Sequence, residues 1–193
     1  MASTMPWRHW LPLFTENPLD MLRIEGLIDI FLQPGEFFVA DADYQVRTML
    51  GSCVSITLWS PVHRVGAMSH FLLPTKGRAK AGEPLDARYG DEALQLMIAE
   101  LKTMGISPKQ CQGKIFGGGN MFPNHVHAGS MSVGQRNGEA AQDLLAAHGI
   151  PIVSESLFGI GHRQILFDLS NGDVWCHQIA PNDYDPQSSG DLV

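Results

Sequence analysis

Short strand-like segments outnumber helical ones in this sequence, and the two helical segments fall between strands. Val54, Ile56 and Leu58, for example, alternate with Ser55 and Thr57, which is the period of a strand. Similar short segments recur along the chain, at 34–41, 46–49, 64–74, 151–156, 163–169 and 174–179. This order is typical of a layered domain in which helices cover one face of a sheet. It predicts an α/β or α+β fold with two main helices.

The two helical segments are predicted at 91–105 and 133–149. In the first, apolar residues recur at helical spacing and predict a buried stripe made of Leu94, Met97, Ile98 and Leu101. Asp91 and Glu92 suit its first turn, and Gly105 suits its end. The second carries its small and apolar residues on one side, and Gly149 can end it. Near the C-terminal end, 170–173 (Ser-Asn-Gly-Asp) predicts a hairpin turn.

The size and charge of the chain limit its function. The 193 residues, 44% of them hydrophobic, suffice for one domain with a real core. The net charge of −7 argues against nucleic acid as the main partner, since that partner requires a basic surface. Four basic residues between Pro74 and Gly90 are interpreted as a solvated loop; they are Lys76, Arg78, Lys80 and Arg88.

No apolar run approaches the roughly 18 residues of a membrane helix, and 1–14 lacks the pattern of a signal peptide. We therefore expect a cytoplasmic protein without membrane insertion. Three scattered cysteines (Cys53, Cys111 and Cys176) do not make a disulfide framework and lack zinc-like spacing. They are predicted to be free thiols.

Cys53 is the residue for which chemistry is worth considering. Core packing is the default for a free cysteine, whereas a nucleophile needs a base and donors for an oxyanion. His70 follows seventeen residues later, and a hairpin-like return from 54–59 to 66–72 would bring it beside Cys53. Thr48 could accept a hydrogen bond from the second imidazole nitrogen. A histidine between Ser69 and Phe71 is equally compatible with a core role.

Other segments give weaker signals. The glycines of 116–122 (FGGGNMF) lack the spacing of a phosphate-binding loop and favour tight turns or close approach of a substrate. His125 and His127 would point the same way on a strand, but no third ligand is evident, so no metal site is predicted. His162 and Arg163, after a Gly-Ile-Gly turn, could line a cleft, but a surface loop is the preferred interpretation.

These motifs resemble the CheD family of chemoreceptor glutamine deamidases. The resemblance rests on TMLGSCVSITLWSP, VGAMSHFLLP, KIFGGGNMF, VGQRNGEAA and HGIPIVSES, and it covers about residues 31 to 180. It leaves 1–30 as an N-terminal extension and 181–193 as a tail. It implies an α-β-β layered sandwich, with Cys53 as nucleophile, His70 as its base and Thr48 as the third member of the site.

The resemblance also implies the reaction and its partners. The expected reaction is hydrolysis of a protein glutamine to glutamate with loss of ammonia, without metal or organic cofactor. The expected substrates are cytoplasmic domains of methyl-accepting chemoreceptors, and a CheC-type phosphatase is a further expected partner. Two alternatives stay open: an adaptor that docks without catalysis, and another thiol enzyme such as a transglutaminase or cysteine protease.

Substrate contacts are predicted at the glycine turn and at 134–138, which gives Gly117, Gly118, Gly119, Asn120, Arg136 and Asn137. Glycines lack a Cβ and would let a receptor helix approach closely. A neighbouring imidazole is expected to lower the pKa of Cys53 below the free value of about 8.5.

Overall fold

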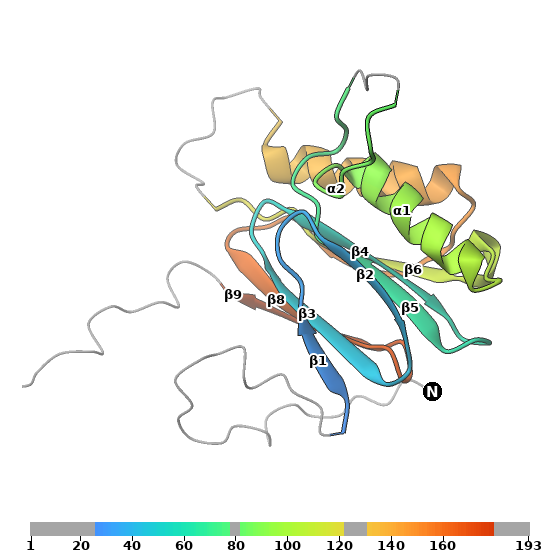
Figure 1. The fold of residues 1–193 in the computed structure, drawn as a ribbon. Helices are drawn as coiled ribbons and strands as arrows, with labels where there is room; N and C mark the ends of the chain where they lie inside the picture. Colours follow the sequence, from blue (N-terminus) through green and yellow to red (C-terminus); the bar gives the residue numbers. More distant parts are fainter. Residues whose placement is uncertain (1–25, 78–81, 122–130, 180–193) are drawn as a thin grey trace, which may run out of the picture.

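The computed structural model describes residues 26–77, 82–121 and 131–179, which form two β-sheets and two α-helices (Figure 1). The first half contains β1 (Ile28–Phe31), β2 (Phe37–Asp41), β3 (Tyr44–Leu50), β4 (Val54–Ser60), β5 (Val65–Ser69) and α1 (Gly90–Thr103). The second half contains a 3₁₀ turn (Pro108–Gln110), β6 (Gln112–Gly117), α2 (Val133–Ala147), β7 (Ile152–Leu157), β8 (His162–Asp168) and β9 (Val174–Ile179).

Both sheets are mixed. The five-stranded sheet has the order β2-β5-β4-β6-β7, in which only β6 and β7 run parallel. The four-stranded sheet has the order β1-β3-β8-β9, in which only β1 and β3 run parallel. The hairpin turn predicted at 170–173 is confirmed, because β8 and β9 pair antiparallel on either side of it.

The core has two parts, one on each side of the five-stranded sheet. Val54, Ile56 and Leu58 of β4 face the helices, where Leu94 and Leu101 of α1 are fully buried. On the opposite face, a second cluster fills the space between the sheets; it contains Val46, Leu50, Met68, Phe116, Ile165 and Phe167. The helices thus cover one sheet and the other sheet covers its back (Figure 1). This confirms the predicted α-β-β architecture.

Two segments differ from the expectation drawn from the sequence. The predicted strand 64–74 ends at Ser69, because the backbone of His70 bonds to the turn before β2. Beyond it, the Leu72 N–H donates to the Arg88 carbonyl. Residues 28–31 form β1 and pair with β3, so β1 begins inside the proposed N-terminal extension of residues 1–30. The proposed limits of the domain stay a prediction.

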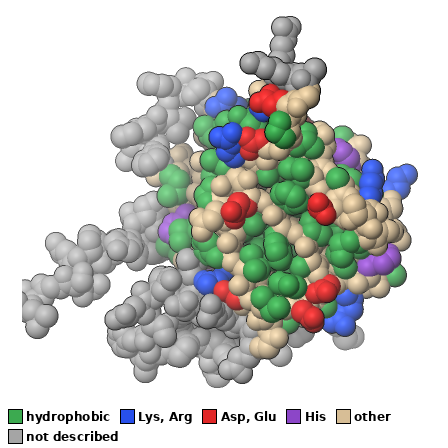
Figure 2. All heavy atoms as spheres, viewed as in Figure 1, with side chains coloured by type: hydrophobic (Ala, Val, Ile, Leu, Met, Phe, Trp, Pro, Cys, Tyr) green, Lys and Arg blue, Asp and Glu red, His purple; other side chains and the backbone are tan. Residues whose placement is uncertain are grey.

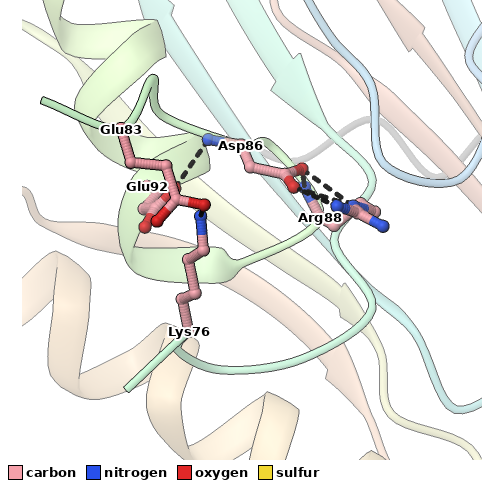
Figure 3. A network of polar contacts seen from close by, with 5 residues as sticks. All are labelled: Lys76, Glu83, Asp86, Arg88 and Glu92. Carbon is pink, nitrogen blue, oxygen red and sulfur yellow. Dashed lines mark hydrogen bonds and ion pairs between the residues drawn. The ribbon is translucent and has the colours of Figure 1, made fainter. Parts of the chain in front are cut away.

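The two described basic residues of the 74–90 region are paired with acidic ones. Lys76 Nζ lies 2.7 Å from Glu83 Oε1, and Arg88 Nε donates to Asp86 at 2.8 Å (Figure 3). Lys and Arg side chains near the top of this face accordingly lie beside acidic side chains (Figure 2). Arg78 and Lys80 lie outside the described residues. In the described part of the chain, no helix is long and apolar enough to cross a membrane.

Candidate active site

Cys53 lies between the end of β3 and the start of β4, where the chain passes from one sheet to the other. The residue is half-buried and packs against the cluster between the sheets. Side chains alternate along a strand, so Cys53 faces the second sheet while Val54 faces the helices. Cys53 therefore lies at the end of the inter-sheet layer, with part of the residue open to solvent.

His70 lies beside Cys53 on the adjoining strand. The N–H of Val54 donates to the carbonyl of Phe71 at 3.1 Å, and the N–H of Phe71 donates back at 3.0 Å. This pairing places Leu72 opposite Cys53 and makes His70 its diagonal neighbour on the same face, a relation that spans roughly 7–8 Å between Cα atoms. The predicted hairpin return is confirmed.

The turn before β2 holds the backbone of His70. The N–H of His70 donates to the carbonyl of Glu36 at 2.9 Å, and its carbonyl accepts from Gly35 at 2.7 Å. Gly35 has a φ of +85°, a conformation that glycine adopts without strain. The turn predicted at Pro34-Gly35 thus fixes the histidine after the ladder with β4 has ended.

Thr48 reaches His70 from the other sheet. Thr48 is buried in the middle of β3, and its Oγ1 lies 2.8 Å from His70 Nδ1. The same hydroxyl donates its one proton to the carbonyl of Leu32 at 2.7 Å. It must therefore accept from an Nδ1–H group, which leaves Nε2 unprotonated with a lone pair available. Nε2 is buried and has no hydrogen-bond partner among the described residues.

The pKa values of both groups favour their neutral forms. Burial lowers the pKa of His70 to about 4, against smaller opposing effects of the Leu32 carbonyl and the Glu36 carboxylate. Burial also raises the pKa of the Cys53 thiol, and a hydrogen bond from its own backbone N–H offsets this in part. The expectation that the imidazole lowers the Cys53 pKa is wrong, because desolvation outweighs an uncharged neighbour.

The glycine turn after β6 holds the backbone around Cys53. The N–H of Gly118 donates to the carbonyl of Cys53, and that of Gly119 to the carbonyl of Gly51, each at 2.8 Å. A Cβ on Gly117 would lie 2.3 Å from the Cys53 carbonyl oxygen, and one on Gly119 2.2 Å from that of Gly161. The close approach that these glycines permit is therefore to the protein's own backbone.

The other predicted contact residues lie around the same turn. Asn120 is half-buried and exchanges backbone hydrogen bonds with Gly159 and Gly161. Arg136 is exposed near the start of α2, and Asn137 is fully buried beside it. The role of these residues in substrate binding stays a prediction. His125 and His127 lie outside the described residues.

Arg163 has a role that the sequence did not reveal. It is buried in β8 and not in a surface loop. Its guanidinium donates to the carbonyls of Gly117, at 3.2 Å, and Phe158, and to the hydroxyl of Ser156. These hydrogen bonds from β8 fix the backbone at the start of the glycine turn. The only sequence signal was an arginine shortly before the apolar run 165–167.

A hydrogen-bonded imidazole and hydroxyl thus lie on the layer between the sheets that Cys53 also borders, at one end of an α-β-β domain. This set of groups is typical of enzymes that transfer acyl groups through a thiol. A family model described as "CheD chemotactic sensory transduction" matches residues 72–178. The chain belongs to the CheD family.

Two curated relatives illustrate the similarity. The "probable chemoreceptor glutamine deamidase CheD 2" of Albidiferax ferrireducens is 68% identical over 90% of this chain and 100% of its own length. The "probable chemoreceptor glutamine deamidase CheD" of Pseudomonas savastanoi pv. phaseolicola is 44% identical over 78% of this chain and 84% of its own.

Proposed function

We propose that this protein hydrolyses glutamine side chains of chemoreceptors to glutamate and ammonia, with Cys53 as the nucleophile. The observation that carries the proposal is the hydrogen bond of 2.8 Å between Thr48 and His70. This hydrogen bond fixes the proton of the ring on Nδ1. The Nε2 of His70 therefore keeps a lone pair that can accept the proton of the Cys53 thiol. The printed names of the relatives, which describe chemoreceptor glutamine deamidases, supply the substrate class.

In the first half of the reaction, His70 Nε2 takes the thiol proton while the sulfur attacks the carboxamide carbon. The carbonyl π electrons move to oxygen, and the resulting oxyanion is held by backbone N–H groups near Cys53. When the intermediate collapses, the C–N bond breaks. The imidazolium returns its proton to the departing nitrogen, which leaves as ammonia. The product of this half is a thioester between Cys53 and the substrate side chain.

In the second half, water attacks the thioester carbon while His70 accepts the water proton. The C–S bond then breaks, the proton returns to sulfur, and glutamate leaves as its carboxylic acid, which ionises in water. His70 thus acts as base and then as acid in each half. No metal or organic cofactor takes part.

Because the Cys53 thiol and the His70 imidazole are both neutral before the reaction, the timing of proton transfer follows from their burial. Burial disfavours a preformed thiolate–imidazolium pair, since both ions would lose hydration. Proton transfer therefore accompanies the attack of sulfur on the amide. Thr48 Oγ1 accepts from Nδ1–H throughout, and this hydrogen bond strengthens as the ring becomes positive. The thiol therefore reacts with a carboxamide that is positioned in the site and not with molecules that only collide with it.

The substrate is a glutamine on the cytoplasmic domain of a methyl-accepting chemoreceptor, so the protein works in the cytoplasm. The receptor surface around the glutamine contacts the rim formed by the glycine turn, Asn120 and the start of α2 with Arg136. Binding energy from this rim positions the carboxamide for attack. A CheC-type phosphatase competes for the same rim.

The test is ammonia release from a receptor cytoplasmic fragment, a short glutamine peptide and free glutamine at equal concentrations. The receptor fragment should react fastest and free glutamine slowest, with Cys53→Ala inactive on all three. Equal turnover of free glutamine and receptor would indicate a small-molecule glutaminase. Receptor binding without ammonia release would indicate an adaptor, and cleavage of the main chain would indicate a protease.

A further inference from the structure

The side chain of Asn137 joins two strands at the point where Cys53 leaves the ladder. Its Nδ2 donates to the carbonyl of Ser52 at 3.0 Å and to that of Leu72 at 2.8 Å. Val54 and Phe71 form an isolated bridge beyond the end of the ladder between β4 and β5. Asn137 thus uses both of its amide protons, one on the carbonyl of the residue before Cys53 and one on the carbonyl of the residue after Phe71.

The fold holds Asn137 in this position from α2. The residue is fully buried, and two glycines of the same helix allow the close approach. A Cβ on Gly134 would lie 2.5 Å from the Gly118 carbonyl oxygen, and one on Gly138 2.5 Å from the Phe158 ring. The Oδ1 of Asn137 is buried without a hydrogen-bond partner in the described part of the chain. An unpaired buried acceptor costs free energy, so Asn137 is not simply filling space.

The bond to Ser52 acts on the peptide that precedes Cys53. The Ser52 carbonyl and the Cys53 N–H belong to one planar trans peptide, in which the two groups point in opposite directions. When Asn137 fixes the carbonyl, it also fixes the direction of the N–H. A hydrogen bond to the carbonyl further polarises the peptide and makes the N–H a stronger donor.

We infer that Asn137 is a positioning residue, which directs the Cys53 N–H toward the negative charge that forms at the reacting centre. That charge is partial on the sulfur while the proton moves to His70, and full on the oxyanion of the tetrahedral intermediate. The Cys53 backbone N–H also acts to lower the pKa of the Cys53 thiol, against the larger effect of burial, which agrees with this direction. The inference rests on the proposed function for its catalytic part, but its effect on the thiol is independent of any substrate.

Three variants test the inference. Asn137→Ala removes both hydrogen bonds, Asn137→Ser keeps one hydroxyl donor, and Leu145→Ala is a matched control two turns along the same helix. Leu145 is fully buried in the core between α2 and the sheet, away from Cys53. All three should lower the melting temperature, so loss of stability alone does not separate them.

The first readout is the pH dependence of Cys53 alkylation by iodoacetamide, measured on folded protein. Asn137→Ala should raise the apparent thiol pKa and slow alkylation at pH 8 about tenfold, and Leu145→Ala should leave both unchanged. The second readout is deamidation, for which Asn137→Ala should lower kcat about 10- to 100-fold with little change in KM. Asn137→Ser should recover part of each loss.

An unchanged thiol pKa and kcat in folded Asn137→Ala would overturn the inference, as would equal effects of Asn137→Ala and Leu145→Ala. Failure of both Asn137 variants to fold would also overturn it, because the residue would then be a determinant of the fold. If the unaltered protein does not deamidate receptors, the proposed function fails. The alkylation comparison still decides whether Asn137 orients the Cys53 peptide.

Discussion

Replacing Thr48 by valine removes the hydroxyl that fixes the His70 tautomer while keeping a branched side chain of similar size. The change leaves two buried groups without partners, His70 Nδ1 and the Leu32 carbonyl. Each unpaired group costs about 1–3 kcal/mol of folding free energy. The free energy of unfolding of a natural domain is about 5–15 kcal/mol, so Thr48→Val should still fold.

The catalytic effect can be estimated from the same hydrogen bond. In the transition state His70 carries a positive charge, and hydrogen bonds to charged groups contribute about 1.5–3 kcal/mol. Loss of that contribution lowers kcat roughly 10- to 150-fold, since about 1.36 kcal/mol corresponds to a factor of ten. Without the hydroxyl the ring can also take the Nε2–H tautomer, which has no lone pair toward Cys53.

The assay is ammonia release from a receptor cytoplasmic fragment, with the folded fraction checked by urea unfolding. Thr48→Ser keeps the hydroxyl and serves as the control, so it should retain most of the activity. His70→Ala should be at least as impaired as Thr48→Val. The reasoning would be refuted if Thr48→Val lost less than about threefold in kcat, or if the serine and valine variants were equally active.

Four further predictions concern the same site. Cys53→Ala should abolish ammonia release with the fold intact, whereas Cys111→Ala and Cys176→Ala should remain active; residual deamidation by Cys53→Ala, measured against a no-enzyme blank, would exclude this nucleophile. Because the pKa of His70 is lowered to about 4, activity should persist at pH 5.5, where an imidazole with the ordinary pKa of about 6.5 would be mostly protonated. The unfolded chain binds the His70 proton more tightly than the folded one, so the unfolding free energy should fall by about 3 kcal/mol as pH drops from about 6.5 to about 4; a His70→Ala variant with the same pH dependence would contradict this. Gly118→Ala should destabilise the protein and slow deamidation, since its Cβ would lie 2.7 Å from the Gly134 carbonyl oxygen; Gly105→Ala, which has the same kind of positive φ with nothing within 4 Å, should cost only about 1–2 kcal/mol of backbone strain and keep its activity.

The part of the site that is local in sequence could be predicted, and the part built by distant contacts could not. Thr48, Cys53 and His70 lie within 23 residues, and the strand period with the hairpin return is enough to bring Cys53 and His70 together. The layered fold followed in the same way from alternating apolar residues.

Contacts between residues that are far apart in the sequence leave no comparable signal in the sequence. The bonds of Asn137 to Ser52 and Leu72 join residues 85 and 65 positions apart. The glycines of 117–119 could be recognised from the sequence as sites of close approach. The sequence did not show which backbone segments approach them. The raised pKa of Cys53 depends on burial, and burial is a property of the packed layers and not of the neighbouring sequence.

The most direct test of the proposed chemistry is mass spectrometry of a chemoreceptor cytoplasmic domain, intact and after digestion, incubated with the protein or with Cys53→Ala. The account predicts that the protein converts particular receptor glutamines to glutamate, seen as the mass gain of amide hydrolysis at defined peptides, and that Cys53→Ala leaves every peptide unchanged. An unmodified receptor, or the same modification with Cys53→Ala, would contradict it.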